Sequence, residues 1–372
     1  MAAIDDEDGA QLARPSDSRR DPEQLRLRLD AWLKHQQGPN AKVTEVTVPE
    51  SNGMSSETLL VSAAWDGRDH ALVVRVAPQP DSDPVFPHYD LDGQYRLIEH
   101  VRAHTDVPLP TLWWSETGSD ALGAPFFVMD RVDGRVPPDV MPYNFGSWVS
   151  EATDAQRDAM MRESVRVLAR IHAVPVPGSG VAAPAEGETA LAAHVRRLRE
   201  FYRWACADRA GSPLIERAFD WVDANLPDAS ETVLTWGDAR IGNIIYRDFA
   251  PVAVLDWEMA AAGPRELDVA WMIFLHRFFQ DLAELAGMEG LPGFLRREDV
   301  VAEYRRQTGY QPADLDFYTA YAALIHAVIM FRIQCRAIHF GQAAQPADPD
   351  EMILHRATLE AMLDGTYWGQ VK

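Results

Sequence analysis

The spacing of apolar residues changes along this chain, and that change limits the possible folds more than any other feature. In the first third, apolar and polar residues alternate over 43–48, 58–64 and 70–76, which is typical of β-strands. Asp66-Gly67 lies between the second and third of these segments, where a hairpin turn is expected. Phe126–Asp130 indicates a further strand, and residues 94–104 a helix. We therefore expect an antiparallel sheet of about five strands carrying one helix.

Beyond residue 155 the apolar spacing is mostly helical, and one short β segment at 232–257 interrupts it. A further helix is expected from Pro22 until Gly38 ends it. The expected later helices cover 155–173, 189–208, 213–225, 268–288, 298–308, 314–341 and 349–364. The pattern predicts an α+β fold with a disordered acidic tail (1–21), a β-rich lobe (22–130) and a larger helical lobe (131–372).

The most informative stretch is 232–258, because oxygen-bearing side chains converge in it. It is typical of a strand, a loop and a hairpin whose arms are 244–246 and 252–255. Pairing Ile244 with Leu255 would place Asn243 opposite Asp256 at the open end of the hairpin. Asp238 lies on the loop that enters the same end.

A carboxylate and an amide oxygen at one point suit Mg²⁺, which takes few protein ligands and completes its shell with water and phosphate. Asp238 would then be free to accept or orient a hydroxyl proton. A metal that neutralises phosphate charge and a positioned nucleophile are what phosphoryl transfer requires. The stretch therefore indicates a phosphoryl-transfer site.

The same residues carry a resemblance to a known family. WGDARIGN at 236–243, with VLDWE at 254–258 and LDVAW at 267–271, resembles the aminoglycoside phosphotransferase and choline kinase family. That family has the bilobal protein-kinase-like fold. The chain is most similar to the bacterial branch related to the kinase-like domain of some acyl-CoA dehydrogenases. The similarity extends from about residue 40 to 340.

The resemblance implies a role for each matching position. It implies that Asp238 is the catalytic Asp and that Asn243 and Asp256 bind Mg²⁺. Asp268 matches an Asp that braces the catalytic loop, and it could simply be the N-cap of its helix, which is compatible with the bracing role. ATP and Mg²⁺ are therefore the expected cofactors.

The nucleotide site is expected in the β-rich lobe. The serine-rich turn at 51–56 matches the loop over the phosphates, and Arg75 on the third strand matches the phosphate-binding cation. The segment 127–132 matches the hinge, in which backbone groups of Asp130 and Val132 would bond adenine. The nucleotide-binding candidates are Ser51, Asn52, Gly53, Ser55, Ser56, Arg75, Met129, Asp130 and Val132.

Three positions depart from the family pattern. Trp236 stands where the family usually has a scaffold His, and Arg75 stands where kinase-like folds usually have Lys. An arginine still supplies a permanent charge and forked donors. The acid that usually pairs with this cation aligns with Gln94, and Glu99 is the fallback.

Several further residues carry open alternatives. Glu258 could face a second metal or the substrate, or pair with Arg240 or Arg265; Glu258 and Arg240 are kept as supporting site residues. His172 is expected to be a packed, hydrogen-bonded histidine. Trp257, next to Asp256, is the tryptophan to consider as a ligand platform.

Charge and composition exclude several function classes. The only lysines are Lys34, Lys42 and Lys372, so the long interval without lysine excludes a Walker-A loop and most Schiff-base chemistry. A phosphate clamp in that interval must use arginine. The net charge of −21 argues against a nucleic-acid or anionic-membrane partner. It is compatible with a cationic substrate, and acidity that serves only solubility is the favoured alternative.

A cytoplasmic location is expected. Cys206 and Cys335 lack the spacing of a disulfide framework or a zinc site, and the acidic N-terminus is unlike a signal peptide. The apolar run 318–331 is shorter than the about 20 residues of a membrane span, so it predicts a buried core helix. The oligomeric state stays open.

The expected activity is ATP-dependent phosphorylation of a hydroxyl on a small molecule. An aminoglycoside acceptor, with antibiotic resistance as its consequence, is the first expectation. A hydroxyacyl-CoA or another metabolite is the alternative, and Arg196, Arg197, Arg199 and Arg203 on one helix either face such an anion or form a solvated surface. A nucleotide-binding pseudokinase is the alternative from a different class.

Overall fold

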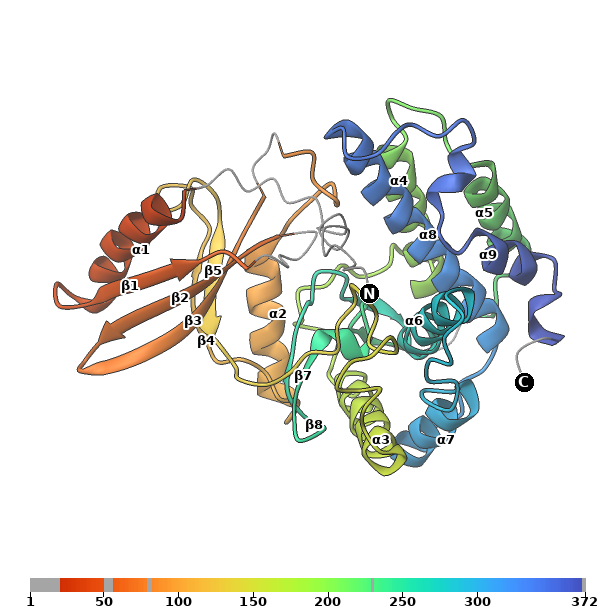
Figure 1. The fold of residues 1–372 in the computed structure, drawn as a ribbon, viewed down its shortest axis with the longest axis horizontal. Coiled ribbons are helices and arrows are strands. Elements are labelled where there is room, and N and C mark those ends of the chain that lie inside the picture. Colours follow the sequence, from red (N-terminus) through yellow and green to blue (C-terminus); the bar gives the residue numbers. More distant parts are fainter. Residues whose placement is uncertain (1–20, 50–55, 79–81, 229–230, 370–372) are drawn as a thin grey trace, which may run out of the picture. The chain divides into compact units, whose positions relative to one another are not determined.

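The alternating segments form the predicted antiparallel sheet (Figure 1). The computed structural model describes residues 21–49, 56–78, 82–228 and 231–369. It contains two units. The first holds residues 1–95, 110–131 and 339–342, and the second holds 96–109, 132–338 and 343–372. The predicted tail lies outside the described residues except for Asp21, whose carboxylate caps the first helix.

The first unit consists of the sheet and a helix. The strands are β1 (Lys42–Thr47), β2 (Glu57–Trp65), β3 (Arg68–Val76), β4 (Leu112–Glu116) and β5 (Phe126–Asp130), in the order β1-β2-β3-β5-β4 with antiparallel neighbours. Asp66 and Gly67 both have positive φ, as a tight two-residue hairpin turn requires. Strand β4 was not predicted from the sequence, because all five of its residues are partly exposed and show no alternation of burial.

Alternation along β3 separates its apolar residues from Arg75. Leu72, Val74 and Val76 are buried, whereas Arg75 lies on the other side of the strand. Helix α1 (Pro22–Gln37) lies beside β1 and buries Leu25, Leu29 and Leu33 (Figure 1). Helix α2 (Leu91–His104) crosses the division between the two units.

The second unit is mainly helical, as predicted. Its larger helices are α3 (Asp154–Ile171), α4 (Ala190–Ala205), α5 (Pro213–Asn225), α6 (Glu266–Leu285), α7 (Arg297–Thr308) and α8 (Leu315–His339). The predicted helix 349–364 is wrong as one element: it consists of the 3₁₀ turn η3 (Pro349–Met352) and α9 (Arg356–Leu363), followed by the 3₁₀ turn η4 (Tyr367–Gly369). His355 interrupts it, because its ring bonds to the carbonyl of Ala323 on α8.

Two short antiparallel strand pairs lie between α5 and α6 in the chain. Strand β6 (Thr232–Thr235) pairs with β9 (Ala261–Pro264), and β7 (Ile244–Arg247) pairs with β8 (Ala250–Val254). The 3₁₀ turn η2 (Ile241–Asn243) leads into β7. These pairs hold the two ends of the motif-bearing segment in fixed positions.

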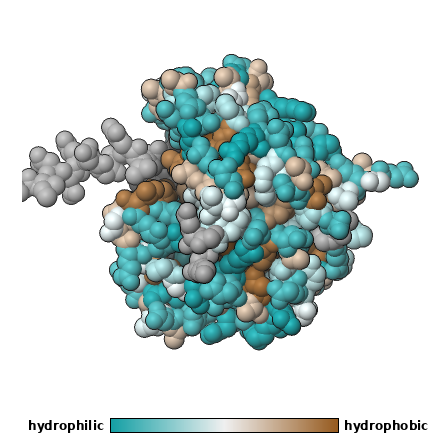
Figure 2. Space-filling view, turned by 90° about the vertical axis from the view of Figure 1, so that its right-hand side faces the viewer, coloured by the Kyte–Doolittle hydropathy of each residue, from teal (hydrophilic) through white to brown (hydrophobic). Residues whose placement is uncertain are grey.

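Helix α8 is the core helix of the second unit. Within the described part of the chain, it alone is long and apolar enough to cross a membrane by length and composition, yet 72% of its apolar window is buried inside the protein. This burial fits the predicted core helix. The face of the molecule in Figure 2 is mainly hydrophilic, with smaller hydrophobic areas between the polar residues.

Candidate active site

Asp238 follows β6, and three side chains donate to its carboxylate. The indole Nε1 of Trp271 lies 2.7 Å from Oδ1, and the amide Nδ2 of Asn243 lies 2.6 Å from Oδ2. Nε of Arg240 lies 3.0 Å from Oδ1 and 3.1 Å from Oδ2. The side chain remains 17% exposed. The carboxylate is therefore fixed in orientation while it stays accessible to a small molecule.

Arg240 connects two carboxylates. Its Nη1 lies 2.5 Å from Oδ1 of Asp139, and its Nε bonds Asp238. Burial alone would lower the pKa of Arg240, but the negative charges of Asp238 and Asp139 raise that pKa above its usual value. Gly242 leaves room for this pair, because a Cβ there would lie 2.5 Å from Nη1 of Arg240. Glycine at 242 therefore leaves the space in which Arg240 pairs with Asp139.

The hairpin β7–β8 brings Asn243 close to Asp256, but in a register that differs from the predicted one. Ile244 pairs with Val254, and the N–H of Leu255 donates to the carbonyl of Asn243 at 2.9 Å. Asn243 therefore lies opposite Leu255, and Asp256 is the next residue. The predicted pairing of Ile244 with Leu255 is wrong by one position.

Asp256 has φ of +60°, a left-handed conformation that Asp adopts more readily than most residues. The turn thus bends away from β8 at Asp256. Because the amide nitrogen of Asn243 is directed to Asp238, its amide oxygen is the atom left to face a cation.

Trp236 joins the two halves of the site. Its buried indole Nε1 donates to the carbonyls of Leu255 at 2.9 Å and Asp256 at 3.1 Å. The next residue, Gly237, has φ of +90°, and a Cβ there would lie 2.2 Å from the carbonyl oxygen of Met259. Indole and glycine together hold the Asp238 loop against the Asp256 turn.

Asp268 holds the backbone of the same loop. Its Oδ2 accepts from the N–H of Trp236 at 2.7 Å, and its Oδ1 accepts from the N–H of Gly237 at 2.9 Å. Nε2 of His172 lies 3.0 Å from Oδ2, and Nδ1 of His172 lies 2.7 Å from the hydroxyl of Tyr304. Since a carboxylate only accepts, Nε2–H of His172 donates to Asp268 and Nδ1 accepts from Tyr304.

Asp268 is fully buried and belongs to the first turn of α6, where Arg265 occupies the N-cap position. The N-cap alternative for Asp268 is therefore wrong. His172 is packed and hydrogen-bonded, as expected.

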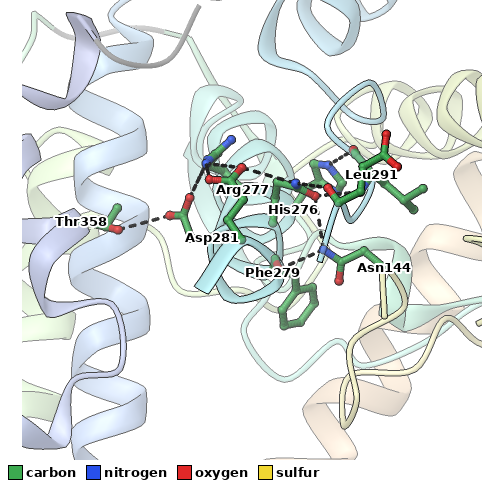
Figure 3. A network of polar contacts seen from close by, with 10 residues as sticks. Asn144, His276, Arg277, Phe279, Asp281, Leu291 and Thr358 are labelled. Atoms are coloured by element: carbon green, nitrogen blue, oxygen red, sulfur yellow. Dashed lines mark hydrogen bonds and ion pairs between the residues drawn. The ribbon is translucent and has the colours of Figure 1, made fainter. Parts of the chain in front are cut away.

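The other end of α6 is anchored by a second polar network (Figure 3). Nδ2 of Asn144 donates to the carbonyl of Phe279 at 2.9 Å. The ring of His276 bridges the Tyr143 hydroxyl, at 2.7 Å, and the carbonyl of Leu291, at 3.2 Å. Asp281 lies between Arg277 on α6 and Thr358 on α9, at 2.7 Å from Nε and 3.2 Å from Oγ1. Helix α6 is therefore fixed at both ends while it supplies Asp268 and Trp271.

Comparison with known proteins identifies this arrangement. A sequence model of the phosphotransferase enzyme family matches residues 48–306, which include the Asp238 loop, the Asp256 turn and Asp268. The chain belongs to the phosphotransferase enzyme family. Acyl-CoA dehydrogenase family member 10 of Mus musculus is 25% identical over 327 residues, covering 85% of this chain. Since the match covers 29% of the mouse protein, this phosphotransferase spans less than a third of that relative.

Solved structures share the kinase-like α+β fold. A crystal structure from Ralstonia eutropha, described as an aminoglycoside phosphotransferase, has a TM-score of 0.66 and 21% identity, covering 92% of this chain and 98% of that one. A thermostable mutant of aminoglycoside phosphotransferase APH(4)-Ia, solved with ADP and hygromycin B, has a TM-score of 0.54 and 15% identity over 90% and 98% of the two chains.

Some of the predicted nucleotide-binding residues of this phosphotransferase lie outside the described residues. Those are Ser51, Asn52, Gly53 and Ser55. Ser56 is buried, and its hydroxyl has no hydrogen-bond partner among the described residues. Arg75 pairs in register with Thr58 and Phe127 across the sheet.

The predicted hinge forms the end of β5. Met129 is buried and pairs with Val73. The N–H of Asp130 donates to the carbonyl of Thr111 at 2.8 Å, and the N–H of Arg131 donates to that of Ala71 at 2.9 Å. The N–H of Asp130 is therefore already used, and the donor that the hinge prediction requires is the N–H of Val132.

The alternatives for the remaining candidates can now be compared with their contacts. Arg240 bonds Asp139 and Asp238, and Arg265 bonds Glu231, so other carboxylates engage both arginines proposed for Glu258, which is half-buried. Gln94 is half-buried, and Glu99 is exposed.

Two other expectations about side chains can be judged. Trp257 is not a ligand platform: it is 3% exposed and packs against Trp236 with ring centroids 6.2 Å apart. Arg196 pairs with Glu188 and Glu200, and Arg199 pairs with Asp223, which fits the solvated-surface alternative for these two arginines, whereas Arg197 is half-buried.

Two residues that hold the site were not predicted from the sequence. Trp271 is part of the LDVAW motif, but nothing in its spacing indicates that its N–H reaches Asp238. Asp139 lies about a hundred positions upstream of Arg240, among prolines, and shows no local pattern. Only an unpaired arginine inside the motif could have prompted a search for a carboxylate partner.

The donor set suits a hard cation with few protein ligands. Within 21–49, 56–78, 82–228 and 231–369, no group of three or more His, Cys, Asp or Glu side chains is arranged to hold a metal ion. One carboxylate and one amide oxygen, as at Asp256 and Asn243, match Mg²⁺ better than a metal that needs a complete protein cage.

Proposed function

We propose that this phosphotransferase transfers the γ-phosphate of ATP to a hydroxyl of a small molecule. The observation that carries the proposal is the convergence of Asp238, Asn243 and Asp256 at the open end of one hairpin, joined by the indole of Trp236. The ADP in the APH(4)-Ia complex supports a nucleotide as the phosphate donor. Arg75 and the hinge at Val132 are the proposed nucleotide contacts.

In this mechanism Asp238 orients the acceptor hydroxyl and receives its proton. The N–H groups of Trp271, Asn243 and Arg240 hold the carboxylate, so little reorganisation is needed when the reaction starts. Asn243 and Asp256 would hold Mg²⁺, which supplies charge neutralisation on the phosphates when it is bound. The residues of the chain thus contribute mainly positioning.

The test separates catalysis from nucleotide binding. Replacing Asp238 by Ala should lower kcat by about 10²–10⁴-fold, because proton acceptance and orientation are lost, with ATP affinity retained. Asp256→Asn should weaken Mg-ATP binding; Asn tolerates positive φ, so the loss would not come from backbone strain. Asp248→Asn is the matched control, since Asp248 is exposed at the hairpin tip with φ of +50°. Near-full activity of Asp238→Ala would contradict the mechanism.

For the acceptor, we propose an aminoglycoside-type molecule first. The fold neighbours described as aminoglycoside phosphotransferases support it, and hygromycin B is present in one of them. A hydroxyacyl-CoA is the second candidate, which the name of the mouse relative favours. ADP release with a panel of both acceptor classes distinguishes them.

The same assay addresses the pseudokinase alternative. Tight ATP binding without turnover on any acceptor would favour a nucleotide-binding module. Turnover with one class, lost in Asp238→Ala and kept in Asp248→Asn, would exclude it.

A further inference from the structure

A cavity of about 710 Å³ lies within the helical unit. Its walls come from the end of α3, the segment 172–177, the start of β6, Arg265 and the end of α7. None of the residues 236–243 lines it, so it is separate from the site built around Asp238. Its volume is in the range of small-molecule pockets.

Three arginines line this cavity: Arg166, Arg170 and Arg265. Glu231 is the one carboxylate among the residues that line it. In a chain with three lysines and a net charge of −21, these three guanidinium groups supply cationic N–H donors along one cavity. Guanidinium groups bind phosphate through paired N–H donors, so the lining favours a phosphate group over other anions of low charge.

The arginines are held by partners that a ligand could replace. Arg166 pairs with Glu163, Arg170 with Asp106 and Arg265 with Glu231. The carboxylate side chains are 33%, 75% and 68% exposed, respectively. Ion pairs with exposed partners contribute little to stability, so their exchange for a phosphate in the cavity carries a small cost.

Arg265 offers the most specific contact. Its side chain is 12% exposed, and its guanidinium lies over the ring of Tyr310 at 4.3 Å. Its Nε is buried and has no hydrogen-bond partner among the described residues. A buried donor without an acceptor is unfavourable, so an acceptor oxygen that reached Nε would be favoured there.

Part of the lining is apolar. Val174, Pro175, Val176 and Pro177 follow one another along the cavity, and the two prolines restrict the backbone there. A wall of this kind can bury the organic part of a ligand, which inorganic phosphate lacks. The combination of arginines and an apolar wall fits an organic phosphate.

One lining residue, His172, also belongs to the hydrogen-bond network that holds the catalytic loop, although its side chain is only 1% exposed. His172 bonds Asp268, which accepts from the N–H groups of Trp236 and Gly237. Arg265 lies close to the Tyr304 hydroxyl, which donates to His172: burial raises the pKa of Tyr304, and the charge of Arg265 opposes that rise.

We propose that this cavity binds an organic phosphate and that its occupancy restrains the Trp236–Gly237 backbone through His172 and Asp268. The phosphate bonds Arg166, Arg170 and Arg265, and the organic part lies against the segment 174–177. The proposal does not depend on the phosphoryl acceptor or on catalytic turnover.

Binding is tested with phenyl phosphate and inorganic phosphate on the full chain by calorimetry. The variant R166Q/R170Q removes two of the three arginines, both about 40% exposed, so the fold should be retained. R162Q is the matched control, because Arg162 is an exposed residue of the same helix that does not line the cavity. A nucleotide site can also bind phosphates. The cavity is therefore assigned by the difference in phenyl phosphate affinity between R166Q/R170Q and R162Q.

We expect phenyl phosphate to bind R166Q/R170Q at least tenfold more weakly than it binds wild type or R162Q. Wild type should bind phenyl phosphate more tightly than it binds inorganic phosphate. Hydrogen exchange of the Trp236 and Gly237 amides should slow when phenyl phosphate is added to wild type. Equal binding by R166Q/R170Q and R162Q, or no saturable binding by wild type, would overturn the site. Equal affinity for both probes would overturn the organic part, and unchanged amide exchange at saturation would overturn the link to the loop.

Discussion

The indole N–H of Trp271 donates to the carboxylate of Asp238 at 2.7 Å, so a residue on α6 orients the proposed catalytic group. Trp271→Phe keeps the ring and removes the donor. We expect kcat to fall about tenfold, in line with the loss of one hydrogen bond to a charged group, while KM for ATP stays unchanged. Steady-state kinetics check this.

The control is Trp257→Phe. It removes an indole N–H that lies 3.4 Å from the carbonyl of Val254 and does not contact Asp238. An equal loss of kcat in both variants would show that Trp271 acts only through packing.

Trp236→Phe should separate the two halves of the site. Its N–H serves two backbone carbonyls, of Leu255 and Asp256, and both would lose that donor. We expect a loss of about 1–3 kcal/mol in the free energy of unfolding and a higher Mg²⁺ requirement, because the Asp256 turn is less restrained. Urea denaturation and a magnesium titration of activity measure the two effects. Loss of stability with an unchanged magnesium dependence would limit Trp236 to a packing role.

Asp268→Asn should impair the loop more than its small change in shape suggests. The carboxylate accepts from Trp236, Gly237 and His172, and an amide would direct an N–H at one of these donors. We expect lower stability and faster hydrogen exchange of the Trp236 and Gly237 amides. Asp281→Asn, at the other end of α6, is the comparison: it should leave exchange at Gly237 as in wild type.

Stability should fall when the pH decreases from about 6.5 to about 4. Burial lowers the pKa of His194, His276 and His355 to about 4 in the folded protein, against 6.5 for an ordinary histidine. In this window the unfolded chain binds more protons, so acid favours unfolding. Above pH 6.5 the contribution is fully present.

Each of these histidines can add up to about 1.4 kcal/mol per pH unit to the slope of unfolding free energy against pH. Urea unfolding at several pH values measures the slope. His194→Gln should reduce it, whereas His35→Gln, at an exposed position, should not. An identical slope in His194→Gln would contradict the assignment.

The sequence predicted most of the architecture because periodicity reports burial directly. It predicted the motif residues of the site because a short loop and a hairpin keep them together in the chain. The register of β7–β8 could not be predicted. Asp248 and Phe249 form the turn with φ of +50° and +63°, and Phe gives no turn signal.

A bulge between Ile245 and Tyr246 then shifts the pairing of the two strands. The ring of Phe249 packs against that of Trp148, with ring centroids 5.5 Å apart. Asp139 and Trp271 could not be predicted as site residues either. Their roles depend on tertiary contacts with residues distant in the sequence.

Helix α6 has a consequence for how this enzyme can diversify. Asp268 and Asp281 are thirteen residues apart, which is about 20 Å along a helix. The helix is one continuous element whose first turn holds the loop of Asp238 and whose last turns bond Asn144 and Thr358. Substitutions at the distant end of α6 can therefore change catalytic efficiency without touching the reacting groups.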